Sequence, residues 1–166
     1  MQHEAQVAGA DPRDLAGPFN HRVSVTVRFA DTDAQGHVNN AVYLTYCETA
    51  RIKYWTDVTG ELFAQGSEGA RSLILAEARI TYRAQVFYGD EVTVESRATR
   101  IGRTSFTLEH RLLATAPGGP DRLVAVGDSI LVRFDYTLQR PVPLSPENIA
   151  ALEKHEGRPL RDATNR

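Results

Sequence analysis

A short polar segment near the N-terminus holds the side chains that are best suited to act on a substrate. In chain order its reactive residues are Asp31, Asp33, His37, Asn39 and Asn40, and a run of helix-compatible residues follows. The first turn of a helix presents unpaired N–H groups and the positive end of the helix dipole, both of which stabilise a developing oxyanion. A carboxylate beside that turn can activate water or attack a carbonyl carbon directly. The sequence does not choose between these two routes.

The residues before this segment alternate between apolar and polar. The apolar positions are Val23, Val25, Val27 and Phe29, and polar or charged residues stand between them. A period of two predicts a strand with one buried face, and we expect this strand to begin near His21. The polar segment is therefore predicted as a loop that connects a strand to a helix.

The run after the loop has the spacing of a helix with one buried stripe. The stripe, at steps of three and four residues, comprises Tyr43, Cys47, Ala50, Tyr54 and Val58. We predict that Asn39 or Asn40 caps this helix and that Gly60 ends it. A helix of about 18 residues is roughly 27 Å long, which is too short to cover the whole apolar face of a sheet. We therefore expect a homodimer or homotetramer.

Four further strands are predicted after the helix, over residues 72–83, 91–100, 104–114 and 122–138. The segments 88–90, 101–103 and 117–121 contain glycine and separate these strands, so we predict antiparallel turns there. Ser145 and Pro146 are the residue types of a helix N-cap and first position, which predicts a short C-terminal helix. One strand, one long helix and four more strands make an α+β domain.

Length and composition favour one globular domain. The chain has 166 residues, of which 42% are hydrophobic and 24% charged, and a formal net charge of -2. This length suits one ordinary domain, and so small a charge gives no strong field to attract nucleic acid. We assign residues 1–20 to a loosely ordered tail, 21–143 to the domain, and 144–166 to the short C-terminal helix and a tail.

The sequence also argues against export, membrane insertion and metal binding. No apolar run approaches the roughly 20 residues of a membrane span, and the N-terminus lacks the apolar core of a signal peptide. The single cysteine, Cys47, cannot form an intrachain disulfide. No His, Cys and carboxylate grouping has metal-ligand spacing. We therefore expect a cytoplasmic protein with no bound metal, no nucleic-acid partner and no membrane association.

The loop and helix resemble a known signature. The stretch from Val27 to Leu44, with Asp31-Thr32-Asp33 and His37-Val38-Asn39-Asn40 inside it, is similar to that of the 4-hydroxybenzoyl-CoA thioesterase family. The segment 86–92 resembles that family's sheet turn, and the likeness covers roughly residues 21–143. It implies a hotdog fold, in which a five-stranded antiparallel sheet wraps one long central helix. It also implies hydrolysis of the thioester bond of an acyl-CoA or acyl-acyl-carrier-protein, with no cofactor beyond the coenzyme A of the substrate.

The resemblance assigns roles to residues of the loop. The family's catalytic carboxylate, the second Asp of the Asp-x-Asp pair, falls on Asp33, and the backbone N–H that receives the thioester oxygen falls on Asn40. Gly36 allows the substrate to approach the backbone closely, and Tyr43 is expected to contact the substrate. His37 either orients the substrate by a hydrogen bond or makes a plain loop contact. Without the surrounding pattern, Asp33 would be an ordinary turn or cap residue.

Other polar residues have a structural explanation beside a functional one. Asp31 is expected to hold the loop through side-chain-to-backbone bonds. Glu48 lies on the polar helix face, where a second class of hotdog thioesterases carries its catalytic carboxylate, but it can instead pair with Arg51. Cys47 has no neighbouring His and is expected to pack in the core.

Two rival functions share the hotdog fold. A dehydratase also acts on acyl thioesters, but it needs a His with a carboxylate from a facing subunit and lacks the Asp-x-Asp loop. A non-catalytic acyl-thioester sensor would not need Asp33. The sequence leaves the acyl group open. It also leaves open whether the coenzyme A phosphates are held by Arg97, Arg100 and Arg103 or whether these arginines form a solvated face.

Overall fold

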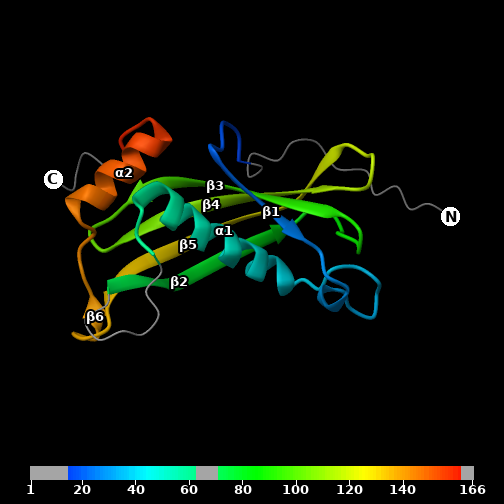
Figure 1. The fold of residues 1–166 in the computed structure, drawn as a ribbon, viewed down its shortest axis with the longest axis horizontal. Helices are drawn as coiled ribbons and strands as arrows, with labels where there is room; N and C mark the ends of the chain where they lie inside the picture. The colour runs from blue at the N-terminus through cyan, green and yellow to red at the C-terminus, as the bar shows by residue number, and fades with distance from the viewer. Residues whose placement is uncertain (1–14, 63–70, 162–166) are drawn as a thin grey trace.

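One antiparallel sheet dominates the computed structural model, which describes residues 15–62 and 71–161 (Figure 1). Its strands follow the order β1-β3-β4-β5-β2, and the short β6 pairs with β5. The strands are β1 (His21–Thr26), β2 (Arg71–Tyr82), β3 (Glu91–Ile101), β4 (Ser105–Thr115), β5 (Asp121–Asp135) and β6 (Arg140–Pro141). The helical elements are the 3-10 turn η1 (Phe29–Asp31), α1 (Val42–Thr59) and α2 (Pro146–Glu156). In the described part of the chain, neither α-helix combines the length and the apolar character that crossing a bilayer requires.

The long helix α1 lies along one face of the sheet, which confirms the hotdog architecture (Figure 1). Its C-terminus is the predicted one, because Gly60 adopts a left-handed conformation with φ 74°. Val58 at the end of the apolar stripe is only partly buried. The fully buried stripe residues are Tyr43, Cys47, Ala50 and Tyr54.

The buried side of the sheet also follows the predicted alternation. The residues that face α1 are Val92, Val94, Ser96 and Ala98 on β3 and Phe106, Leu108, His110 and Leu112 on β4, and all are buried. Burying one such leucine stabilises the fold by about 1.5 to 3 kcal/mol. One core cluster surrounds the N-terminal half of α1, and a second surrounds its C-terminal half and α2.

The N-terminus of α1 differs from the prediction. The cap is Ala41, in helical conformation and without a side-chain bond, rather than Asn39 or Asn40. Asn39 instead accepts a hydrogen bond from the Ala41 N–H through its side-chain Oδ1, at 2.9 Å. The Asn39 side chain therefore closes the turn before the helix instead of capping the helix. Asparagine can do either, because its side-chain oxygen can accept a hydrogen bond from the backbone N–H two residues later.

The first strand ends earlier than predicted, and Phe29 is not on its buried face. The strand stops at Thr26, and Phe29 opens the 3-10 turn with a side chain that is 77% exposed. The cause is Asp31, whose carboxylate accepts a hydrogen bond from the Arg28 N–H at 2.9 Å and bends the chain.

The segment 88–90 is a crossover rather than a turn between paired strands. β2 pairs with β5 at one edge of the sheet, whereas β3 pairs with β1 and β4. The other two predicted turns do join paired strands, β3 to β4 and β4 to β5. At the crossover, Asp90 Oδ2 accepts from the Phe87 N–H at 2.9 Å and Gly89 has a φ of 98°. The alternation of apolar and polar residues predicts where strands lie but not which strands pair. The pairing of β2 with β5 could therefore not be predicted from this alternation.

The last predicted strand is divided. β5 ends at Asp135, whose carboxylate accepts hydrogen bonds from the N–H groups of Thr137 and Leu138, and β6 follows this turn. The C-terminal helix α2 begins as predicted, with Ser145 Oγ accepting from the Asn148 N–H and Pro146 in the first turn.

The end of the predicted N-terminal tail is packed against the sheet. Residues 1–14 lie outside the described residues, but Phe19 is only 6% exposed. The guanidinium groups of Arg97 and Arg111 lie 4.4 and 4.6 Å from the centroid of its ring. Arg97 also donates to the carbonyl oxygen of Ala16 at 2.9 Å. The segment next to β1 is thus held by cation–π contacts and hydrogen bonds.

Candidate active site

The loop that carries Asp33 is a tight turn closed by backbone hydrogen bonds. Thr32 and Val38 form an antiparallel bridge at its base. Inside it, the Asp33 N–H donates to the His37 carbonyl oxygen and the Gly36 N–H donates to the Asp33 carbonyl oxygen, both at 3.0 Å. Gly36 has a φ of 83°, a conformation that favours glycine, and apart from Gly36 and its two chain neighbours no described atom lies within 4 Å of the position a Cβ would take. The space beside Gly36 is therefore open.

The two carboxylate oxygens of Asp33 have different surroundings. Oδ1 accepts a hydrogen bond from the Gln35 N–H at 2.8 Å, which supports the turn. Oδ2 lies 3.9 Å from His37 Nδ1, and the Asp33 side chain is 26% exposed. His37 is tethered in turn, because its Nε2 donates to Gln35 Oε1 at 3.0 Å. One oxygen of Asp33 thus serves the loop, and the other remains accessible to a ligand.

Asp31, two residues earlier, is buried and fully engaged. Arg28 donates to its carboxylate from the backbone N–H and from the guanidinium, and the Tyr46 hydroxyl donates to Oδ2 at 3.0 Å. Burial acts to raise the pKa of Asp31, but the hydrogen bonds from Arg28 and Tyr46 outweigh it and hold that pKa below the ordinary 3.8. The predicted structural role of Asp31 is confirmed.

In the turn that leads into α1, the Asn40 backbone N–H has no hydrogen-bond partner among the described residues. The Asn39 N–H donates to the Asp31 carbonyl oxygen, and the Ala41 N–H donates to Asn39 Oδ1, both at 2.9 Å. The Val42 N–H donates to the Asn39 carbonyl oxygen at 3.0 Å. Between them, the Asn40 N–H donates to no group in residues 15–62 or 71–161. A free N–H at the entrance of a helix can receive a developing oxyanion.

Tyr43 is placed apart from the other predicted site residues. Its side chain is 3% exposed in the core, and burial raises its pKa to about 12. Its hydroxyl donates a long hydrogen bond of 3.4 Å to the Ala84 carbonyl oxygen and also interacts with the Val86 backbone. The structure therefore gathers Asp33, Gly36 and His37 in one turn with Asn40 beside it, and it leaves the contact of Tyr43 with substrate a prediction.

Glu48 and Cys47 both have the structural roles that the sequence allowed. Arg51 donates to Glu48 Oε1 at 2.8 Å, and the Glu48 side chain is 54% exposed. Cys47 is buried, and its burial raises its pKa to about 12, so its thiol does not ionise near neutral pH. Neither residue lies in the Asp33 turn.

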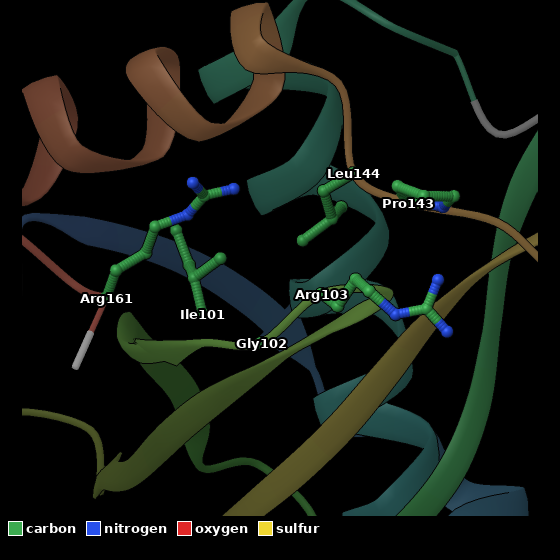
Figure 2. Close-up of a pocket in the computed structure, with 6 residues that line it drawn as sticks. All are labelled: Ile101, Gly102, Arg103, Pro143, Leu144 and Arg161. Atoms are coloured by element: carbon green, nitrogen blue, oxygen red, sulfur yellow. The ribbon is translucent and has the colours of Figure 1, made fainter. Parts of the chain in front are cut away.

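A cavity of about 410 Å³ lies away from the Asp33 turn, beside α2 (Figure 2). Figure 2 shows Arg161 and Arg103 with the apolar side chain of Leu144 between them. The lining of this cavity includes Arg103, a candidate for binding the coenzyme A phosphates, but none of the residues predicted for catalysis or acyl binding. We therefore locate the candidate site by the chemistry of the loop rather than by the cavity. The Arg97 guanidinium is already engaged by protein groups, because it donates to Glu109 Oε2 at 2.9 Å and covers Phe19.

Sequence reasoning missed two tyrosines that hold the site. Tyr46 reaches Asp31 from α1, and the Tyr82 hydroxyl donates to the Asn40 carbonyl oxygen at 2.8 Å from the end of β2. Tyr46 lies one helical turn from Tyr43, so its burial could have been inferred. No local signal links Tyr82 to Asn40, because the pair is far apart in sequence.

A family model with the description "Thioesterase-like superfamily" matches residues 27–152. The chain belongs to this superfamily. The match begins at the residue after β1 and extends into α2, so it includes the candidate site of this superfamily member and most of its core. The resemblance to the hotdog thioesterases is confirmed.

Individual relatives agree with this membership. A 1,4-dihydroxy-2-naphthoyl-CoA hydrolase from Synechococcus elongatus is 34% identical over 52% of this chain and 64% of its own length. The match thus spans a little under two thirds of that relative. A thioesterase from Thermus thermophilus, complexed with coenzyme A and Zn, is 37% identical with a TM-score of 0.71 over 86% of this chain and 98% of that one.

A third comparison concerns the fold alone. A 1,4-dihydroxy-2-naphthoyl-CoA thioesterase from Synechocystis is 22% identical, with a TM-score of 0.65 over 80% of this chain and 94% of that one. In the present chain, no group of three or more His, Cys, Asp or Glu side chains among the described residues is arranged to hold a metal ion.

Proposed function

We propose that this protein hydrolyses the thioester bond of an acyl-CoA. The observation that carries the proposal is the pairing of two available groups in one rigid segment. Asp33 Oδ2 accepts no hydrogen bond from residues 15–62 or 71–161, and the Asn40 N–H has no partner there either. A carboxylate and an oxyanion donor are the two groups that acyl transfer requires. Family membership and the relationship to a thioesterase complexed with coenzyme A support the same reaction.

In the proposed mechanism, the thioester carbonyl oxygen accepts a hydrogen bond from the Asn40 N–H, which stabilises the negative charge that develops there. Asp33 then acts by one of two routes. As a base, it takes a proton from a water molecule whose oxygen attacks the carbonyl carbon. As a nucleophile, it forms an acyl anhydride that water subsequently hydrolyses. In both routes the carbon–sulfur bond breaks, and the products are the free acid and coenzyme A as its thiol.

We further propose that the acyl group is aromatic. Support comes from relatives named as 1,4-dihydroxy-2-naphthoyl-CoA hydrolases, one of which is 29% identical over 71% of this chain and 79% of its own length. Acyl-acyl-carrier-protein is the alternative substrate that the resemblance of the loop implies. His37, next to Asp33 and tethered to Gln35, is proposed to orient the bound thioester.

We also propose that the active form is a homo-oligomer. The strand β2 is at an edge of the sheet, and its Leu75 and Tyr82 side chains are both 43% exposed. Exposed apolar side chains on an edge strand are commonly covered by another chain. Light scattering at micromolar concentration tests this proposal, and a monomeric mass with full activity would contradict it. A cytoplasmic location stays a prediction.

The reaction is tested by measuring free-thiol release from a panel of acyl-CoAs that differ in chain length and head group. We expect release from at least one aromatic acyl-CoA at a rate that is proportional to enzyme concentration. Calorimetric titration with the same compounds serves as the second measurement. Binding without thiol release would contradict hydrolysis and favour the sensor function.

A further inference from the structure

We propose that Tyr82 is a positioning residue for the Asn40 N–H, an assignment that rests on the proposed function. Tyr82 is the last residue of β2, opposite Ala125 of β5. Its hydroxyl donates to the Asn40 carbonyl oxygen at 2.8 Å. This bond links the edge of the sheet to the turn before α1. Tyr82 would therefore act on the reaction through the backbone of Asn40 and not by touching the reacting atoms.

The bond to Tyr82 completes a set of anchors along the turn. The peptide group between Asn39 and Asn40 is held at its carbonyl oxygen by the Val42 N–H. The next peptide group is held at its carbonyl oxygen by the Tyr82 hydroxyl and at its N–H by Asn39 Oδ1. Rotation about the Asn40 backbone is thus restrained from both sides. The Asn40 N–H, which has no partner within residues 15–62 and 71–161, therefore has a fixed direction, which is the property an oxyanion donor needs.

The ring of Tyr82 is itself held in place. It packs edge-to-face against the ring of Tyr43, with centroids 5.2 Å apart and an interplanar angle of 86°. Tyr43 is buried in the first turn of α1, so the contact joins the same two elements as the hydroxyl bond. The Tyr82 side chain is nevertheless 43% exposed. Because Tyr82→Phe keeps this ring contact, removal of the hydroxyl should disturb the turn more than it disturbs global stability.

Tyr82→Phe tests the assignment because it keeps the ring and removes the hydroxyl. We expect kcat to fall about 3- to 10-fold, the rate equivalent of one neutral hydrogen bond, with KM changed less than about 2-fold. The thermal midpoint Tm should stay close to that of the wild type. Thiol release from the best acyl-CoA of the panel gives the kinetic constants.

Backbone hydrogen exchange provides a readout that does not depend on activity. In Tyr82→Phe the N–H groups of Asn39 and Ala41 should exchange faster than in the wild type, whereas those of β4 should not change. The matched control is Tyr136→Phe. Tyr136 is 39% exposed and packs against the Phe134 ring, and its hydroxyl makes no hydrogen bond within residues 15–62 and 71–161. We expect wild-type kcat and wild-type exchange for this control.

The outcomes separate the inference from the proposed function. A wild-type kcat in Tyr82→Phe would overturn the assignment. A rise in KM with kcat unchanged would also overturn it, because that result indicates direct contact between Tyr82 and the substrate. If the wild type hydrolyses no acyl-CoA, the proposed function fails, and exchange alone decides whether Tyr82 restrains the turn. Unchanged exchange at Asn39 and Ala41 would then overturn the positioning role as well.

Discussion

Polar networks lie beyond both ends of α1, and they differ in how many of their hydrogen-bonding groups are occupied. After the C-terminus, Glu61, Arg133 and Asn148 are each bonded to the other two, at distances of 2.6 to 3.3 Å. Before the N-terminus, Asp33 keeps one oxygen available and the Asn40 N–H has no described partner. A network whose groups all bond to one another stabilises the fold. Groups that stay available while their neighbours are bonded can act on a ligand.

The largest expected effect comes from Asp33→Asn, which removes the charge of the available oxygen. Asn can still accept the Gln35 N–H bond, so the turn should persist. We expect kcat to fall at least about 100-fold, because an amide replaces neither a base nor a nucleophile. Thiol release measures the loss, and circular dichroism checks the fold. Retention of more than about a tenth of wild-type kcat by a folded variant would show that Asp33 is not the catalytic group.

Arg133→Met should have the opposite profile, with a large effect on stability and little on the chemistry. Arg133 is 8% exposed, and its removal leaves Glu61 and Asn148 without their shared donor. We expect the free energy of unfolding to fall by about 2 to 3 kcal/mol. Urea unfolding measures this change. A specific kcat that also fell about 100-fold, in protein shown to be folded, would contradict the separation of the two networks.

Asp31→Asn distinguishes the buried carboxylate from its available neighbour. We expect a loss of about 2 kcal/mol in unfolding free energy at neutral pH, and a smaller decrease in kcat than for Asp33→Asn. Because the pKa of Asp31 is lowered in the folded protein, the carboxylate stabilises the fold above its unfolded-state pKa, and this contribution is lost as pH falls through the folded-state value. The stability gap between wild type and variant should therefore narrow below about pH 4. A gap that widened on acidification would contradict this account.

Glu48→Gln should have nearly no effect. Glu48 is 54% exposed and pairs with Arg51, so we expect stability within about 0.5 kcal/mol of wild type. The kcat of the Glu48→Gln variant should stay within about 2-fold of the wild-type value. If kcat collapsed in this variant and not in Asp33→Asn, the catalytic carboxylate would be on the helix instead of in the turn.

Treatment with a chelator is also expected to leave kcat unchanged, since the proposed reaction uses only Asp33 and a backbone N–H. The comparison with a thioesterase complexed with Zn makes this test informative. Loss of activity on chelation, with recovery after a divalent ion is added, would show that a metal takes part.

The sequence predicted the elements whose signals are local. The alternation in β3 and β4, the stripe of α1 and the Ser145 cap each depend on residues within a few positions of one another. The order of strands was missed at the β2-to-β3 crossover, because pairing joins residues that are distant in sequence. Phe29 was misplaced for a different reason. Its apolar character fits a strand, but the Asp31 carboxylate bends the chain into a 3-10 turn.

In the candidate site, too, local features could be predicted and contacts between residues distant in sequence could not. Asp33, Gly36, His37 and Asn40 share one short motif, so the sequence could nominate them together. The groups that hold this motif come from elsewhere, Tyr46 from the buried face of α1 and Tyr82 from the sheet edge. Asn39 was one of two residues predicted to cap the helix, whereas its side chain closes the preceding turn. Residue type favours both roles, and only the backbone conformation decides between them.

The cation–π contacts of Phe19 determine where a recombinant fragment of this protein should begin. A fragment that begins at His21, where the alternating pattern starts, would lack Phe19 and expose the guanidinium faces of Arg97 and Arg111. It would also lose the carbonyl acceptors of Ala16 and Pro18. Such a fragment would leave these two guanidinium groups without their aromatic partner, and we expect a lower yield of folded protein. Expression vectors for crystallisation should therefore retain the chain from Leu15 onward.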